Sequence, residues 1–139
     1  MGDSLKVILD TNIWISFLIG KRLSALNTIL HREGLEIYVS DNLIEEITNV
    51  ALRPKIQRYI SRQCLYDFVE MIETACVHVQ DYATAFTDIR DEKDIYLIAL
   101  AESIPADYLV TGDQDLLVLI RHEKCKIITY NQFCAMIEI

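Results

Sequence analysis

The sequence predicts a three-layer α/β/α sandwich with a central, mainly parallel sheet. Three observations support this fold class. Strand-like and helix-like segments alternate along the chain. The clearest strand segments, residues 6–10 and 107–110, consist largely of apolar, β-prone residues, as expected for strands buried on both faces. Glycine and proline are scarce, at four and two, which favours regular elements with short connections over a turn-rich sandwich.

The predicted elements follow one another closely. Ser40 or Asp41 is expected to cap a helix that Pro54 interrupts. No repeat, low-complexity run or linker divides the chain, so residues 1–139 are expected to form a single domain. Strands are expected at 6–10, 35–39, 77–79, 107–110 and 126–129, and helices from 13, 24, 41, 55, 64, 95, 116 and 131.

Composition narrows the function. Apolar residues make up 52% of the chain and charged residues 24%, as in a globular protein. No signal peptide is visible and no apolar stretch is long enough to cross a bilayer, so we expect a cytoplasmic protein without a membrane partner. The net charge of −8 repels nucleic acid, so a nucleic-acid role would need a local basic patch or bound cations. The four cysteines form no C-x-x-C pair and are expected to be buried, reduced thiols.

Two predicted strands lead into acidic residues. The first ends at Asp10, and the strand at 107–110 runs through Thr111 and Gly112 into Asp113. Parallel strands end at the same edge of a sheet, where α/β proteins bind ligands. If the two strands are neighbours, their axes lie about 4.8 Å apart. The two carboxylates could therefore approach one divalent cation.

Three further acids could join them. Asp94 lies in the first turn of the helix before the strand at 107–110, and Asp91 lies just before that helix. Each could instead cap the helix or compensate its dipole. Glu46 shares a helix face with apolar residues, although an isolated glutamate is usually a surface residue. Together with Asp10 and Asp113, these acids cannot all stay ionised side by side without a cation. Oxygen ligands suit Mg²⁺ or Mn²⁺, which serve phosphoryl chemistry.

The chain resembles the PIN domain nucleases, in particular the toxins of toxin–antitoxin pairs. The resemblance covers essentially the whole length. Four segments in the right order carry it: Val7–Asn12, Ser40–Pro54 with Glu46 and the trio Arg53-Pro54-Lys55, Asp91 with Asp94 before an apolar helix, and Leu109–Leu117. Pro105, where relatives tend to have Gly or Ala, is one departure; it lies away from the acids.

That resemblance implies a ribonuclease that uses Mg²⁺ or Mn²⁺ to hydrolyse single-stranded RNA. It also implies an antitoxin partner and a homodimer. Its implied metal ligands and catalytic residues are Asp10, Glu46, Asp94 and Asp113. The implied supporting residues are Asn12 and Thr111, which would orient the acids, Asp115 near the site, and Asp91 at a commonly acidic position.

The RNA surface and the competing functions stay open at this point. Lys55, Arg58 and Arg62 would form one stripe if their segment is helical, with Arg53 beside them; the alternative is a solvated helix face. Lys21 and Arg22 form a second small basic cluster. The alternatives are a non-catalytic RNA- or protein-binding module, a DNA-directed nuclease, and a phosphatase of the haloacid dehalogenase type. Such a phosphatase needs a second aspartate where Asn12 stands.

Overall fold

The computed structural model describes residues 4–80, 92–119, 121–122 and 124–137, and for residues 92–96 and 121–122 the backbone alone. Strands and helices alternate through most of this part of the chain. The elements are β1 (Leu5–Leu9), α1 (Thr11–Ile19), α2 (Leu23–Leu30), β2 (Leu35–Ser40), α3 (Asp41–Ala51), α4 (Pro54–Gln57), α5 (Arg62–Ala75), β3 (Val77–Val79), α6 (Glu92–Ser103), β4 (Tyr108–Val110), α7 (Gln114–Leu117), β5 (Arg121–His122), β6 (Cys125–Ile128) and α8 (Tyr130–Ile137).

The strands form one sheet in the order β3-β2-β1-β4-β6-β5. All neighbouring pairs are parallel except β5 with β6. From β1 the chain builds outward through β2 to β3, then crosses back to place β4 on the other side of β1. The strand order therefore reverses between β1 and β4, and the crevice beyond their carboxyl ends is where open α/β sheets bind ligands.

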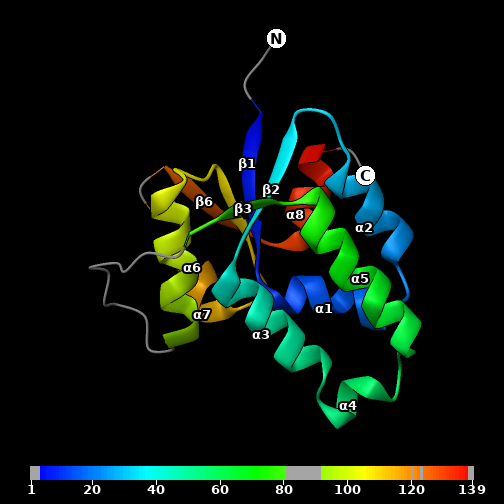
Figure 1. Ribbon diagram of the computed structural model, residues 1–139. Helices are drawn as coiled ribbons and strands as arrows, with labels where there is room; N and C mark the ends of the chain where they lie inside the picture. The colour runs from blue at the N-terminus through cyan, green and yellow to red at the C-terminus, as the bar shows by residue number, and fades with distance from the viewer. Residues whose placement is uncertain (1–3, 81–91, 120, 123, 138–139) are drawn as a thin grey trace.

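Helices cover both faces of the sheet and confirm the predicted sandwich. In Figure 1, α2 and α5 lie to the right of the strands and α6 lies to the left. β1 runs downward in that view, so the carboxyl ends of the parallel strands point toward the bottom, where α1 and α3 begin. The crossovers from β1 to β2 and from β2 to β3 run in one direction along the sheet, and the crossover from β3 to β4 runs back. Because crossovers between parallel strands are right-handed, the two directions place helices on opposite faces.

The core consists of apolar side chains from the strands and both helix layers. Val7, Ile8 and Leu9 of β1 are fully buried, as a strand covered on both faces requires. Trp14 and Phe68 are also fully buried and meet edge to face, with ring centroids 6.3 Å apart. Within the described residues, no helix has the length and apolar character needed to cross a membrane.

Two local features differ from the expectation. Lys55, Arg58 and Arg62 do not form a stripe on one helix, because α4 ends at Gln57 and α5 begins only at Arg62. The Ser61 side chain accepts a hydrogen bond from the backbone N–H of Cys64 and so starts a new helix between the basic residues. Strand β5, two residues long, was not predicted.

Candidate active site

Asp10 lies at the carboxyl end of β1, directly opposite β4. The strand register pairs Leu9 with Val110, and the backbone N–H of Asp10 donates to the Val110 carbonyl over 2.9 Å. Asp10 also occupies the N-cap position of α1, where its carbonyl accepts from Ile13. The strand and the helix thus fix its backbone from both sides, and its side chain is only 7% exposed.

Hydrogen bonds link Asp10 to the acids after β4. The fully buried Thr111 hydroxyl donates to Asp10 Oδ2 over 2.7 Å and accepts from the backbone N–H of Asp113 over 3.0 Å. Asp113 Oδ1 in turn accepts from the backbone N–H of Asp115 over 2.8 Å and caps α7. The register that pairs Leu9 with Val110 also places residues 10 and 111 side by side, so sheet geometry itself orients the Asp10 carboxylate.

The charge of Asp10 is poorly compensated among the described residues. Burial is the main cause that raises the pKa of the Asp10 carboxyl, and the charges of Asp113 and Glu46 raise it further. The hydrogen bonds from the Thr111 hydroxyl and the Thr11 backbone act in the opposite direction without cancelling burial. A buried carboxylate with two acidic neighbours is the environment that a bound cation would relieve.

Glu46 reaches this region from α3. Ser40 ends β2 and caps α3, its side chain accepting from the backbone N–H of Leu43 over 3.3 Å. Because β2 neighbours β1, this helix starts at the same edge of the sheet as α1. Glu46 is half-buried and acts on the charge of Asp10, whereas Glu45 is exposed.

The other two acids before β4 are placed only in part. Helix α6 leads into β4 and begins at the bottom of Figure 1, the end of the molecule at which β1 ends. Asp94 lies in the first turn of α6, so its backbone is at the same edge as Asp10 and Asp113. The side chain of Asp94, and Asp91 altogether, lie outside the described residues.

The residues that follow Asp10 differ in their surroundings. Asn12 is exposed on the second residue of α1. Thr11, which was not expected to contribute to the site, is 4% exposed, and its Oγ1 has no hydrogen-bond partner among the described residues. The sequence indicated a role for Thr11 only through its position next to Asp10. Trp14 is part of the core rather than a base-stacking surface, and its indole N–H donates to the Leu9 carbonyl over 3.0 Å.

The described side chains supply part of an oxygen donor set. Asp10, Glu46 and Asp113 are hard oxygen donors of the kind that Mg²⁺ and Mn²⁺ prefer. Among the described side chains, no group of three or more acids, histidines or cysteines is close enough to hold one ion. As carboxylates, Asp10 and the acids acting on its charge are nevertheless the type of ligand that a divalent cation prefers. Further ligands would come from water, substrate or residues outside that set.

The predicted basic residues lie away from Asp10 and its acidic neighbours. Arg53, Lys55, Arg58 and Arg62 are all exposed on and around α4 and the start of α5. Figure 1 shows α4 beyond the far end of α3, at the bottom of the molecule. Any nucleic acid bound by these residues would approach the crevice along α3 and α4.

Comparisons with known proteins identify the family and the fold of this chain. The sequence profile of the PIN domain matches residues 6–115. Protein MJ1680 of Methanocaldococcus jannaschii is 32% identical over 124 residues, covering 83% of this chain and 75% of that protein. The chain superposes on PAE2754 of Pyrobaculum aerophilum with a TM-score of 0.63 at 17% identity, covering 95% of this chain and 88% of the other.

A second solved structure has the same fold. It is VapBC2 of Rickettsia felis bound to a DNA fragment from their promoter, with a TM-score of 0.61 at 15% identity, covering 90% of this chain and 98% of that one. At such identities the structural likeness concerns the fold alone. The profile match spans most of the chain. The chain therefore belongs to the PIN domain family, whose members are generally nucleases.

Proposed function

We propose that the protein is a metal-dependent endoribonuclease that hydrolyses phosphodiester bonds of single-stranded RNA. One observation carries this proposal: the buried Asp10 carboxylate lies at the reversal point of the sheet, under the charges of Asp113 and Glu46. A structural aspartate in such a place would be expected to have a cationic partner. A nuclease instead needs acids grouped around a cation that activates water and stabilises charge on the phosphate.

The proposed roles follow from how each residue is held. Asp10, Glu46, Asp94 and Asp113 would hold one or two Mg²⁺ or Mn²⁺ ions. Thr111 fixes the rotamer of Asp10 through a hydroxyl that also accepts from the Asp113 backbone, so the two acids keep a constant relation.

Glu46 would also help to deprotonate the attacking water from the α3 side. Asp115, whose backbone N–H donates to the Asp113 carboxylate, would hold that ligand in place. Asn12 would help to orient the acids, and Asp91 would be a supporting acid near the site.

We further propose that the protein is the toxin of a toxin–antitoxin pair and acts as a homodimer in the cytoplasm. The structurally similar VapBC2 is a complex bound to DNA from a promoter. By analogy, the partner of this chain would be an antitoxin protein that restrains cleavage. Co-expression with the product of a small neighbouring gene, followed by purification of a stable complex, tests this part.

The activity is tested with the purified chain and end-labelled single-stranded RNA, double-stranded RNA and single-stranded DNA. We expect single-stranded RNA alone to be cut, with Mg²⁺ or Mn²⁺ and not with EDTA, leaving 5′-phosphate and 3′-hydroxyl ends. Cleavage of DNA alone would make the protein a DNA nuclease. Binding of RNA without cleavage in either metal would make it a non-catalytic module.

A further inference from the structure

Two long segments of this acidic chain contain no aspartate or glutamate. Residues 11–32 and 47–66 lack both, although the chain has 21 acidic residues. The two segments nevertheless carry more than half of the 13 lysines and arginines, namely Lys21, Arg22, Arg32, Arg53, Lys55, Arg58 and Arg62. Charge in this protein is therefore segregated, and a local positive surface can exist despite the net charge of −8.

The fold brings the two segments together around one hollow. It has a volume of about 390 Å³ and lies between the start of α2 and the connection from α4 to α5. The first segment contributes Lys21, Leu23 and Ser24, and the second contributes Tyr59, Ile60, Ser61 and Cys64. Among the described residues, the lining thus combines apolar side chains, two serines, an aromatic ring and a lysine, without an acid.

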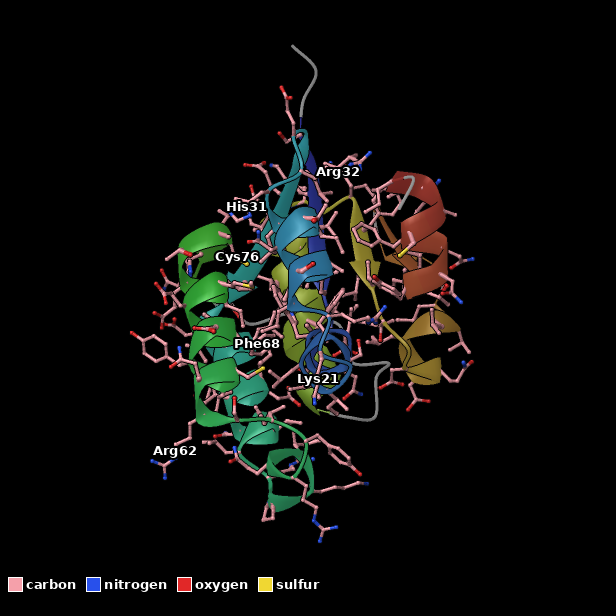
Figure 2. The ribbon with its side chains drawn as sticks, turned by 90° about the vertical axis from the view of Figure 1, so that its right-hand side faces the viewer. Lys21, His31, Arg32, Arg62, Phe68 and Cys76 are labelled. Atoms are coloured by element: carbon pink, nitrogen blue, oxygen red, sulfur yellow. The ribbon has the colours of Figure 1, made fainter. Side chains whose placement is uncertain are left out.

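Not every basic residue of the two segments faces this hollow. The Arg22 guanidinium stacks over the rings of Phe17 and Tyr130, at 5.2 and 5.7 Å from their centroids, on the α8 side. Figure 2 shows His31 and Arg32 at the opposite end of α2 from Lys21, and Arg62 extending from the start of α5 into solvent. Lys21 is therefore the cation among the described lining residues, while Arg58 and Arg62 flank the lining segment Tyr59–Ser61 in the sequence.

We propose that this hollow is an accessory subsite for a nucleotide of single-stranded RNA, separate from the cleavage site. A base would stack on Tyr59, which is 58% exposed, while Lys21 and the flanking arginines contact phosphates. Neutral, aromatic and basic lining matches an unpaired nucleotide. An acidic protein segment would be attracted by the same cations, but its carboxylates would make no use of the exposed Tyr59 ring.

The distance to Asp10 sets the length of RNA that can reach this subsite. Helix α1 begins beside Asp10 and ends at Ile19, just before Lys21. Nine helical residues span about 13 Å, which is about four stacked nucleotides at about 3.4 Å each. RNA bound at the acids would reach the hollow only when it extends at least that far. The inference rests on the proposed ribonuclease function for the identity of its ligand.

The test measures binding by fluorescence anisotropy of a labelled 12-nucleotide uridine RNA, in EDTA so that no cleavage occurs. We expect Tyr59→Ala to weaken the Kd for the 12-mer by about tenfold, since stacking on one aromatic ring is worth about 1–3 kcal/mol. Lys21→Glu should weaken it by a similar factor and reduce its salt dependence. Tyr66→Ala is the matched control, because Tyr66 is 66% exposed on α5 and is not among the lining residues.

The outcomes separate this inference from the proposed function. If Tyr59→Ala and Tyr66→Ala bind the 12-mer as the unaltered protein does, the subsite is wrong, even if the protein cleaves RNA. If Tyr59→Ala alone loses binding while no preparation cleaves RNA with Mn²⁺, the nuclease function is wrong and the subsite stands. If poly-glutamate binds through Lys21 and Tyr59 and RNA does not, the surface belongs to an acidic protein partner and the inference is overturned.

Discussion

Two aspartates at opposite ends of the same pair of strands have opposite environments. Asp107 precedes β4 at the amino edge of the sheet. Its carboxylate accepts the backbone N–H of Lys6 over 2.9 Å and forms an ion pair with Lys124 at 3.3 Å. Asp10 follows β1 at the carboxyl edge. It is buried, its pKa is raised chiefly by that burial, and the charged groups that act on it are acids.

Asp107 therefore has structural partners, whereas Asp10 is the carboxylate that we propose to act in catalysis. The neighbours of Asp107 stabilise its charge and join the ends of two strands, so its contribution is to folding. In the metal-free protein, burial and the acidic neighbours of Asp10 destabilise its charge. Such a cost in folding free energy is typical of a functional site rather than of a structural residue. The two residues are therefore matched positions for mutation, because they have the same chemistry on the same strands.

The largest expected difference between them is in catalysis. Asp10→Asn should lower the rate of RNA cleavage by about 100-fold or more, because a neutral amide cannot replace a carboxylate ligand. Asp107→Asn should leave the rate within about twofold. Both rates would be measured on the same single-stranded RNA under saturating Mn²⁺. An active Asp10→Asn variant, or an inactive but folded Asp107→Asn variant, would reverse the assignment of the two aspartates.

For stability the order of the two aspartates should be reversed: mutation of Asp107 should destabilise the protein, and mutation of Asp10 should not. Asp107→Ala removes the acceptor of the Lys6 N–H and the partner of Lys124, and should lower the free energy of unfolding by about 1–2 kcal/mol. Asp10→Asn should raise the melting temperature of the metal-free protein at pH 7.5 by a few degrees, because it removes a buried charge with acidic neighbours. Urea titration and thermal melting in EDTA check the two changes. A loss of stability in Asp10→Asn would mean that the Asp10 charge is compensated.

The pH dependence gives a smaller but more specific effect. The pKa of Asp10 is raised in the folded protein, so the folded state binds its proton more tightly than the unfolded state does. At pH values above the pKa that Asp10 has in the folded state, this carboxylate therefore destabilises the folded protein to its full extent. It disappears as pH falls toward about 4, the value of an unfolded aspartate. The melting temperatures of the unaltered protein and Asp10→Asn should converge over that range. Curves that stay parallel from pH 8 to pH 4 would argue against a raised pKa.

The smallest effect is expected far from both aspartates. Arg58 and Arg62 are exposed and do not share a helix, so each would contribute a single screened phosphate contact. The double variant Arg58→Glu, Arg62→Glu should weaken RNA binding by several-fold at 50 mM salt and much less at 300 mM. Titrations at the two salt concentrations measure this, and unchanged binding at low salt would place the RNA on another surface.

The fold and the main acids were readable in the sequence because local pattern determines them. Apolar, β-prone strand segments alternating with helices indicate a parallel sheet, and the ends of such strands share an edge. This placed Asp10 and Asp113 at the same edge of the sheet, whereas the structure shows that their strands are neighbours. Separate helices starting near residues 55 and 64 were also expected, and the chain forms them as α4 and α5, with the Ser61 N-cap between them.

Other features depend on register and side-chain packing, which sequence pattern does not encode. The bond from Thr111 to Asp10 follows from the pairing of Leu9 with Val110. The stacking of Arg22 on Phe17 and Tyr130 joins α8 to the end of α1 and withdraws that arginine from the basic surface. The buried Thr11 hydroxyl without a partner is likewise visible only in three dimensions.

The proposed metal site depends most on Asp10 as a ligand of the cation. Thermal melting of the unaltered protein, Asp10→Asn and Asp107→Asn, each in EDTA and in increasing Mn²⁺, tests it directly. We expect Mn²⁺ to raise the melting temperature of the unaltered protein and of Asp107→Asn by several degrees, because ligand that binds only the folded state stabilises it. Asp10→Asn should not respond. An equal response in all three proteins would show that Mn²⁺ binds elsewhere and would contradict the assignment of Asp10.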